Sequence, residues 1–351
     1  METSYLNSAR QSISPLPVSC RGSILIISLW SISLLSVFSV ILAYGVRQEA
    51  MLVKRLDEND KLSFILEAAP QAAFIEFEKS LEGTVCDCLK DAWNNDPAAF
   101  KDVMIGDGVV DFFYDHIDED NGSLEARYGI VDENRKININ KANNQVLERL
   151  FQLALGFNES SSQELAACII DWRDADSMLS IPIGSAENSY YRDSAYPYEA
   201  KNADIESLDE LLLVKGITPD ILEKLRNYIT IYGEGKVNVN TASKTVLLAL
   251  GLDKDIADRI ILFRSGKDKL EGTVDDNIFE TPADIPVRIS ESAQLSESDL
   301  AGLNNVSELY LTTISETFMI KCAAHLNNKK YTARLVCVMD KKGKILYWQE
   351  S

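Results

Sequence analysis

The 351-residue sequence has little of what catalytic and nucleotide-binding sites are built from. It contains only two histidines, His116 and His325, and neither lies in a recognisable setting of a serine or cysteine nucleophile. There is no glycine-rich phosphate loop and no Cys-x-x-Cys pair, which argues against nucleotide chemistry and against a zinc or redox site. We therefore expect a protein that is not an enzyme.

Positive charge is also scarce. The sequence has 35 Lys and Arg against 54 Asp and Glu, which gives a formal net charge of -19. Nucleic-acid binding gains most of its affinity from basic residues placed against phosphates, and anionic membrane surfaces attract proteins in the same way. The charge balance therefore argues against both kinds of partner.

Cysteines are few, and one pair has a spacing that allows a bridge. Cys322 and Cys337 lie on two strand-like runs that are joined by residues 327–330. A turn centred on Lys329 and Lys330 would place the two cysteines directly opposite each other. Either a disulfide or two buried free thiols fits this pattern.

One long hydrophobic run stands out, Ser23–Tyr44. Its 22 residues carry no charge and are enough to cross a bilayer as a helix. No small-residue cleavage site follows the run, as it would in a secretory signal peptide. Arg10 and Arg21 favour a cytoplasmic N-terminus, which would place the bulk of the chain in the periplasm.

Gly22 directly precedes the apolar run, and this arrangement resembles the class III leader of type IV pilins and type II secretion pseudopilins. The resemblance implies cleavage by a prepilin peptidase between Gly22 and Ser23, with the helix kept in the inner membrane. Most pilins carry Glu at the fifth mature position, whereas this sequence has Ile27. The missing Glu and the large size resemble the minor pseudopilin K family of type II secretion. An ordinary single-pass anchor is the alternative.

The rest of the chain shows strand patterns at both ends and helical patterns between them. Apolar residues recur every three to four positions over residues 46–81, so the first helix continues beyond the membrane. These patterns predict an α+β protein, with a pilin-like antiparallel sheet domain that holds a large inserted helical domain. The expected divisions are a leader at 1–22, a transmembrane helix at 23–44, the first part of the sheet domain at 45–136, the helical insertion at 137–288 and the C-terminal strands at 289–351.

The middle of the chain contains an internal repeat, Lys136–Ala142 and Lys236–Ala242, and a helical run follows each copy. This region resembles helix-hairpin-helix DNA-binding units, which grip phosphate with two glycines around one apolar residue. Thr218 and Asp253 occupy the second glycine positions here, and residues 201–287 hold 11 Lys and Arg against 16 Asp and Glu. We therefore interpret the repeat as helical packing units and not as a DNA site.

Asp171, Asp174 and Asp176 lie within six residues of one another at the end of a helix predicted over residues 163–170. A helix C-terminus carries partial negative charge, so three carboxylates there are unfavourable unless a cation lies among them. A hard divalent cation would meet that need, and calcium accepts six to eight irregularly arranged oxygens. The alternative is a solvated acidic loop above packed aromatic residues, since the spacing is not that of an EF-hand.

The same segment carries the most specific resemblance to protein K. It reads Asp-Trp-x-Asp-x-Asp, then Gly-x-Ala-Glu-x-x-Tyr-Tyr, then Ala-Lys-Asn, then Leu-Asp-Glu-Leu. In that family the segment implies a structural calcium site, and the side chains carried over as ligands are Asp171, Asp174, Asp176, Glu187 and Asn202. The resemblance also implies a place at the pseudopilus tip, with minor pseudopilins I and J, and then H and the major pseudopilin, as partners. A membrane-anchored periplasmic binding module is the alternative function.

Overall fold

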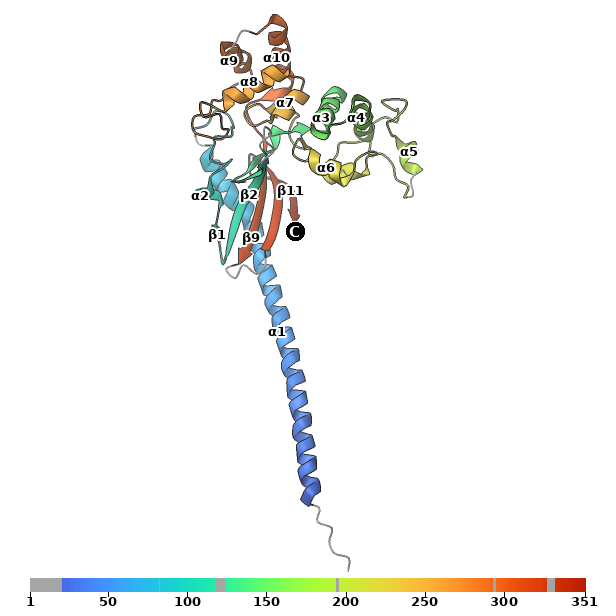
Figure 1. Cartoon of the computed structure of the whole chain (residues 1–351), viewed down its shortest axis with the longest axis vertical. Coiled ribbons are helices and arrows are strands. Elements are labelled where there is room, and N and C mark those ends of the chain that lie inside the picture. Colours follow the sequence, from blue (N-terminus) through green and yellow to red (C-terminus); the bar gives the residue numbers. More distant parts are fainter. Residues whose placement is uncertain (1–20, 82, 118–123, 194–195, 293–294, 327–331) are drawn as a thin grey trace, which may run out of the picture. The chain divides into compact units, whose positions relative to one another are not determined.

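The computed structural model describes residues 21–81, 83–117, 124–193, 196–292, 295–326 and 332–351. The described residues divide into two compact units, one that ends at Asp60 and one that begins at Lys61. The first unit consists, where it is described, of one helix (Figure 1). The second unit combines an antiparallel sheet with many short helices, which confirms the predicted α+β class.

Helix α1 runs from Arg21 to Ser80. It is the one described helix that is long and apolar enough to cross a membrane, and its most apolar 18-residue window has a mean hydropathy of 2.4 with none of it buried. Pro70 lies inside the helix without ending it, although proline removes one backbone hydrogen bond. The last turns of α1 belong to the second unit, where Leu66, Ala73 and Phe77 are buried against the sheet.

The sheet has the strand order β1-β2-β9-β10-β11, with β3 paired to β2 and β4 paired to β9, and every pair is antiparallel. Side chains alternate along β9 and β10, so that one face packs on α1 while the other lies away from it. A short helix, α2, precedes the first strand. The bounds are α2 Pro97–Phe100, β1 Val103–Ile105, β2 Gly108–Ile117, β3 Leu124–Tyr128, β4 Val131–Asp132, β9 Thr317–Leu326, β10 Thr332–Asp340 and β11 Ile345–Glu350.

The register of β9 and β10 differs from the one expected for a turn centred on Lys329 and Lys330. Cys322 pairs with Leu335 and Cys337 pairs with Ile320, so the two cysteines are offset by two residues. Both are buried free thiols, and burial raises the pKa of each to about 12. The expected direct opposition is wrong, because hydrophobic alternation alone cannot distinguish registers that differ by two residues.

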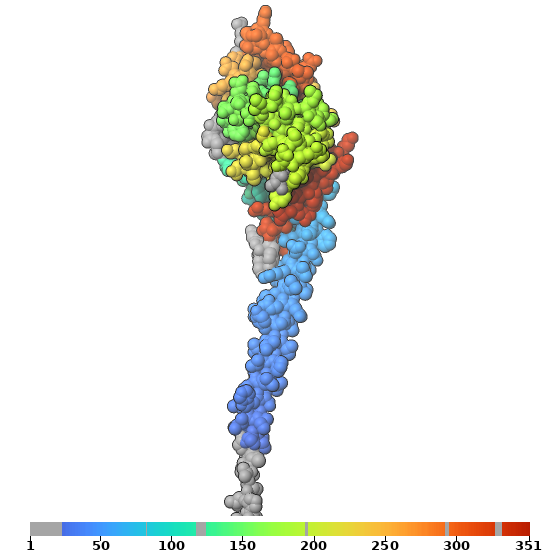
Figure 2. All heavy atoms as spheres, turned by 90° about the vertical axis from the view of Figure 1, so that its right-hand side faces the viewer, coloured from blue at the N-terminus to red at the C-terminus, as the bar shows by residue number. Residues whose placement is uncertain are grey.

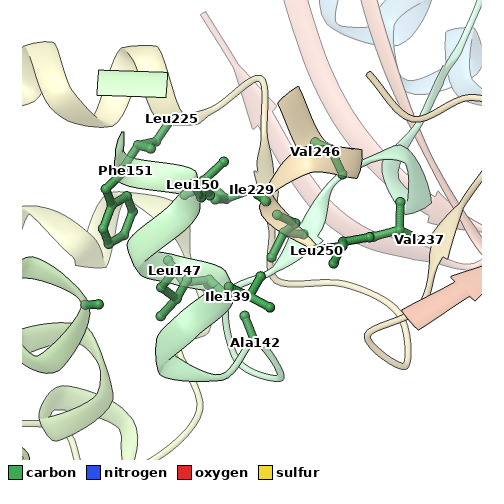
Figure 3. Packing of buried hydrophobic residues seen from close by; sticks show 14 of the residues in the cluster. Ile139, Ala142, Leu147, Leu150, Phe151, Leu225, Ile229, Val237, Val246 and Leu250 are labelled. Atoms are coloured by element: carbon green, nitrogen blue, oxygen red, sulfur yellow. The ribbon is translucent and has the colours of Figure 1, made fainter. Parts of the chain in front are cut away.

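Between β4 and β9 lies a segment of short helices that builds its own hydrophobic core. Leu147, Leu150 and Phe151 project from one face of α3 into that core (Figure 3). The core continues to Leu311, past the expected end of the insertion at residue 288. The bounds are η1 Glu133–Arg135, β5 Ile137–Asn138, α3 Asn144–Leu155, α4 Glu159–Arg173, α5 Asn188–Arg192, η2 Leu208–Leu213, α6 Pro219–Leu225, β6 Ile229–Thr230, β7 Val237–Asn238, α7 Lys244–Ala249, α8 Lys254–Arg264, α9 Asp284–Ser292, α10 Glu297–Tyr310 and β8 Leu311–Thr312.

The internal repeat is a repeated structural device. In the first copy the Asn140 amide accepts from the Ile205 N–H at 2.8 Å and donates to the Ile205 carbonyl at 2.9 Å. In the second copy the Asn240 amide makes the same two bonds to Phe279, both at 2.9 Å. Each asparagine therefore satisfies both backbone groups of a residue far along the chain, which gives the recurring motif a structural role.

The residues at the second glycine positions also have a structural place. Thr218 is the N-cap of α6, and its hydroxyl accepts from the Ile221 N–H at 3.3 Å. Asp253 is the N-cap of α8. Both residues therefore cap the start of a helix. Asp253 also brings a negative charge to the position where a DNA-binding hairpin would bind a phosphate.

Asp132 at the end of β4 joins the sheet to the helical segment. Its side chain is buried, and one oxygen accepts from the Thr241 hydroxyl at 2.5 Å, the Ser315 hydroxyl at 2.7 Å and the Asn238 amide at 3.3 Å. Burial raises the pKa of Asp132 to about 6, the two hydroxyls oppose this rise, and the charge of Asp87 adds to it.

We predict that Asn240→Ala lowers the free energy of unfolding of the full chain by about 2–4 kcal/mol, because it leaves the buried N–H and carbonyl of Phe279 without partners. Denaturant unfolding in detergent measures this. Asn304→Ala, at an exposed position of α10, is the matched control and should change stability by about 0.5 kcal/mol or less. Equal effects of the two substitutions would contradict the structural role of the repeat.

The raised pKa of Asp132 predicts a pH dependence of stability. The folded carboxyl binds a proton more tightly than the unfolded one, so its contribution to stability rises as pH falls through about 6. Relative to Asp132→Asn, the wild-type chain should gain about 1 kcal/mol of unfolding free energy between pH 7.5 and pH 5. A difference between the two chains that does not change with pH would show that Asp132 does not titrate in this way.

Candidate metal centre

The predicted ligands come from two stretches of chain that meet beside the end of α4. Asp171 is in the last turn of α4, and Asp174 is its C-cap. Glu187 is the N-cap of α5. Asn202 lies beyond α5, where its backbone N–H donates to the carbonyl of Trp172 at 2.9 Å and brings the chain back to α4. Figure 2 shows the green to yellow-green residues of this region gathered on one face of the folded unit.

The structure brings all five predicted ligands into one region. Carboxylate oxygens of Asp174, Asp176 and Glu187 lie within 4.8 Å of one another. Asp171 is fully buried at the end of α4. The side-chain amide of Asn202 donates to the carbonyl of Asp176 at 3.2 Å, so the Asn202 side chain lies next to the acidic segment.

Four of these five side chains hold an oxygen that is buried and has no hydrogen-bond partner. These atoms are Asp171 Oδ2, Asp174 Oδ1, Glu187 Oε1 and Asn202 Oδ1. A buried acceptor without a partner costs about 1–3 kcal/mol, so four in one place are a strong sign of an absent ligand.

The other carboxylate oxygens are held by backbone donors. Asp171 Oδ1 accepts from the Ser180 N–H at 2.9 Å, and Asp176 Oδ1 accepts from the Met178 N–H at 2.7 Å. Glu187 Oε2 accepts from the Asn188 N–H at 3.2 Å. These bonds orient the carboxylates and leave at least one oxygen of Asp171 and of Glu187 free to bind an ion.

Negative charge dominates the site, and the charge of Arg173 only partly offsets it at Asp174. Burial, followed by the charges of Asp176 and Asp171, raises the pKa of Asp174. Burial also raises the pKa of Glu187, with Asp171, Asp174 and Asp176 adding to the effect. Among the described residues no Lys or Arg forms a salt bridge with these carboxylates, and Arg173 instead donates to the carbonyl of Ala142.

This donor set fits a calcium ion. All of the candidate donors are carboxylate or amide oxygens, which hard divalent cations prefer over nitrogen or sulfur. Four carboxylates bring a large negative charge to one place. They are arranged irregularly around a helix end and two turns. Calcium tolerates such geometry better than magnesium does.

A second acidic cluster does not have these properties. Carboxylate oxygens of Asp268, Asp275 and Asp276 also lie within 4.8 Å of one another. However, Asp275 accepts from the Lys267 N–H at 2.7 Å, and Asp276 accepts from the Gly272 N–H at 2.7 Å. The hydrogen bonds from Lys267 and the Thr273 hydroxyl hold the pKa of Asp275 at about 2. The carboxylates are hydrogen-bonded within one turn, and none of the three holds a buried oxygen without a partner.

A cavity of about 320 Å³ lies elsewhere, between strands β9–β11 and the α6 region. Its lining includes Lys321, Tyr347, Arg226 and Tyr232. None of the predicted ligands lines it, so this cavity is separate from the metal centre.

Other predicted sites fall at or beyond the limits of the described structure. Ser23 lies on α1 near its start, and the leader before Arg21 lies outside the described residues. Cleavage between Gly22 and Ser23 therefore stays a prediction. Two further residues contact this region and were not predicted from the sequence. Ser180 donates its backbone N–H to Asp171, and Glu210 accepts from the indole N–H of Trp172. Both contacts join residues that are apart in sequence, and the Leu-Asp-Glu-Leu motif was the only signal for Glu210.

Residues 122–234 match the family model described as Type II secretion system (T2SS), protein K. The resemblance to the protein K family is confirmed. The matched segment contains all five predicted calcium ligands. The chain is also 35% identical over 112 residues to the type II secretion system protein K of Aeromonas hydrophila, and 30% identical over 152 residues to that of Pseudomonas aeruginosa.

These alignments cover only part of each protein. They take in 30% and 41% of this chain, and the chain spans 34% and 45% of the length of the two relatives. The fold is similar over a longer range to a chain in the crystal structure of the GspK-GspI-GspJ complex from enterotoxigenic Escherichia coli. That likeness has a TM-score of 0.64 at 15% identity, and it covers 85% of this chain and 99% of the other.

The fit of the donor set predicts a calcium-dependent gain in stability. Calcium at 100 times its dissociation constant should raise the melting temperature of the EDTA-treated full chain by about 5–10 °C, because the ion binds only the folded state. Asp174→Ala should abolish this shift, whereas Asp255→Ala, at an exposed position on α8, should preserve it. A calcium shift that persists in Asp174→Ala would show that the ion binds elsewhere.

Proposed function

We propose that this chain is a minor pseudopilin at the tip of the type II secretion pseudopilus, with a structural calcium site in its helical segment. The observation that carries the proposal is the match of residues 122–234 to the protein K family model. The likeness of fold to a chain of the enterotoxigenic E. coli GspK-GspI-GspJ complex supports it, because that likeness covers 85% of this chain.

The long helix α1 supports a place in the inner membrane with a single span. Its residues 23–46 expose large apolar side chains, which lipid or the helices of other subunits would cover. Ile27 replaces the carboxylate that most pilins carry. We propose that this subunit needs no partner for a charge within the membrane, which suits a subunit above which no other is added.

The proposed neighbours are minor pseudopilins I and J, followed by H and the major pseudopilin. The relative of similar fold was crystallised as a GspK-GspI-GspJ complex. We infer that the helical segment, which lies in sequence between the strands of the sheet, faces the periplasm and blocks further addition of subunits above this one.

Asp171, Asp174, Asp176, Glu187 and Asn202 would hold the calcium ion, with the first four supplying charge and the last a neutral oxygen. Bound calcium would supply the positive charge that this end of α4 lacks. The backbone N–H groups of Ser180, Met178 and Asn188 donate to the carboxylates and orient them. The role of the site is therefore structural, since it fixes the long connection between α4 and η2.

Processing by prepilin peptidase tests the pseudopilin proposal. We predict that the membrane-extracted chain begins at Ser23 in cells with active peptidase and keeps residues 1–22 in cells without it. Intact mass and N-terminal sequencing measure both. An uncut N-terminus in the presence of active peptidase would contradict the proposal and would favour a membrane-anchored periplasmic binding module instead.

A further inference from the structure

We propose that Glu210 is the positioning residue of the calcium site: it supplies no ligand, but it joins the two stretches of chain that carry the ligands. This inference rests on the calcium site of the proposed function. It concerns the Leu-Asp-Glu-Leu motif at the start of η2, to which the ligand set assigns no role.

The two stretches meet next to Glu210. One is the last turn of α4, where Trp172 follows the ligand Asp171. The other is the returning chain, where Lys201 precedes the ligand Asn202. The backbone bond from the Asn202 N–H to the Trp172 carbonyl, 2.9 Å, links the two stretches directly. The side-chain amide of Asn202 adds a second bond, to the Asp176 carbonyl at 3.2 Å.

Glu210 supplies the third and fourth links. Its Oε1 accepts from the Trp172 indole N–H at 2.9 Å, and its Oε2 accepts from the Lys201 ammonium at 2.8 Å. Each carboxylate oxygen therefore holds one of the two stretches. The side chain of Glu210 is largely buried, at 15% exposed, so these charge-assisted bonds are not strongly screened by solvent.

The charge of Glu210 also has a role. Lys201 is the nearest cation in sequence to the ligand Asn202, and an ammonium that turned toward the site would repel calcium. Glu210 holds the Lys201 ammonium in an ion pair and so keeps it from turning toward the calcium site. Glu206 contributes a weaker pair with Lys201, at 3.5 Å from a side chain that is 86% exposed.

Asn202 needs this support because its backbone is in the left-handed region, with φ of 51°. Asparagine tolerates that conformation better than most residues, but it is not the relaxed state of the chain. With Lys201 and Trp172 both fixed by Glu210, the Asn202 side chain donates to the Asp176 carbonyl, and its oxygen is left for the ion.

The experiment compares Glu210→Gln with wild type in the full-length chain, extracted in detergent and depleted of calcium. Terbium serves as the probe ion, with emission sensitised by Trp172, and calcium affinity follows from competition. A partner that hydrogen-bonds directly to a metal ligand is worth about 10–100-fold in metal affinity, and Glu210 acts on the residues next to two ligands, so we expect Glu210→Gln to bind calcium about 10-fold more weakly. The melting temperature in EDTA should change little.

Glu206→Gln is the matched control. It removes the other carboxylate that faces Lys201, and we expect its calcium affinity to stay within about 2-fold of wild type, as for an exposed ion pair. If Glu210→Gln does not fold, Glu210→Asp replaces it. The shorter side chain keeps the charge but cannot reach both Trp172 and Lys201, so its affinity should fall at least 3-fold.

Two results would overturn the inference while leaving the calcium site in place. One is an unchanged calcium affinity in Glu210→Gln. The other is a lower melting temperature in EDTA with no loss of affinity, which would mark Glu210 as a residue of general stability only. A wild-type chain that binds neither calcium nor terbium would instead overturn the proposed site itself.

Discussion

Four buried oxygens without hydrogen-bond partners set the constraint on which the α4–η2 connection depends. They belong to Asp171, Asp174, Glu187 and Asn202, which lie as far as 31 positions apart in sequence. Backbone N–H groups hold the other oxygen of Asp171 and of Glu187, and the Asn202 amide donates to the Asp176 carbonyl, although the carboxylates repel one another. We propose that a cation lies among them, because buried charges without a partner are costly. The chain has fewer Lys and Arg than Asp and Glu, and a calcium ion would supply the positive charge instead.

The helical segment uses its polar residues for structure throughout. The asparagines of the internal repeat each satisfy the backbone N–H and carbonyl of one distant residue, and Asp132 joins the segment to the sheet. Arg264 donates to the carbonyls of Val239 and Ala242 inside the core, so this cation is not available to a phosphate. These structural roles support the interpretation of the likeness to DNA-binding hairpins as a way of packing short helices.

Much of this could be predicted from sequence, and the failures have physical reasons. The α+β class and the long first helix follow from periodicity, and the ligand types follow from the crowding of carboxylates at one helix end. The register of β9 and β10 was not predicted correctly, because Cys322 lies on the same face in any register shifted by two residues. Glu210 was not singled out, because its contact with Trp172 spans 38 residues and depends on tertiary packing that no local pattern encodes.

Amide hydrogen exchange tests the central claim, that calcium fixes the connection between α4 and η2. The informative amides are those of Met178, Ser180, Asn188 and Asn202, since each is bonded to a ligand side chain or belongs to a ligand. The account predicts that calcium slows their exchange at least 10-fold relative to EDTA, while the amides of β9 and β10 are unchanged. Equal exchange at these four amides with and without calcium would contradict the account.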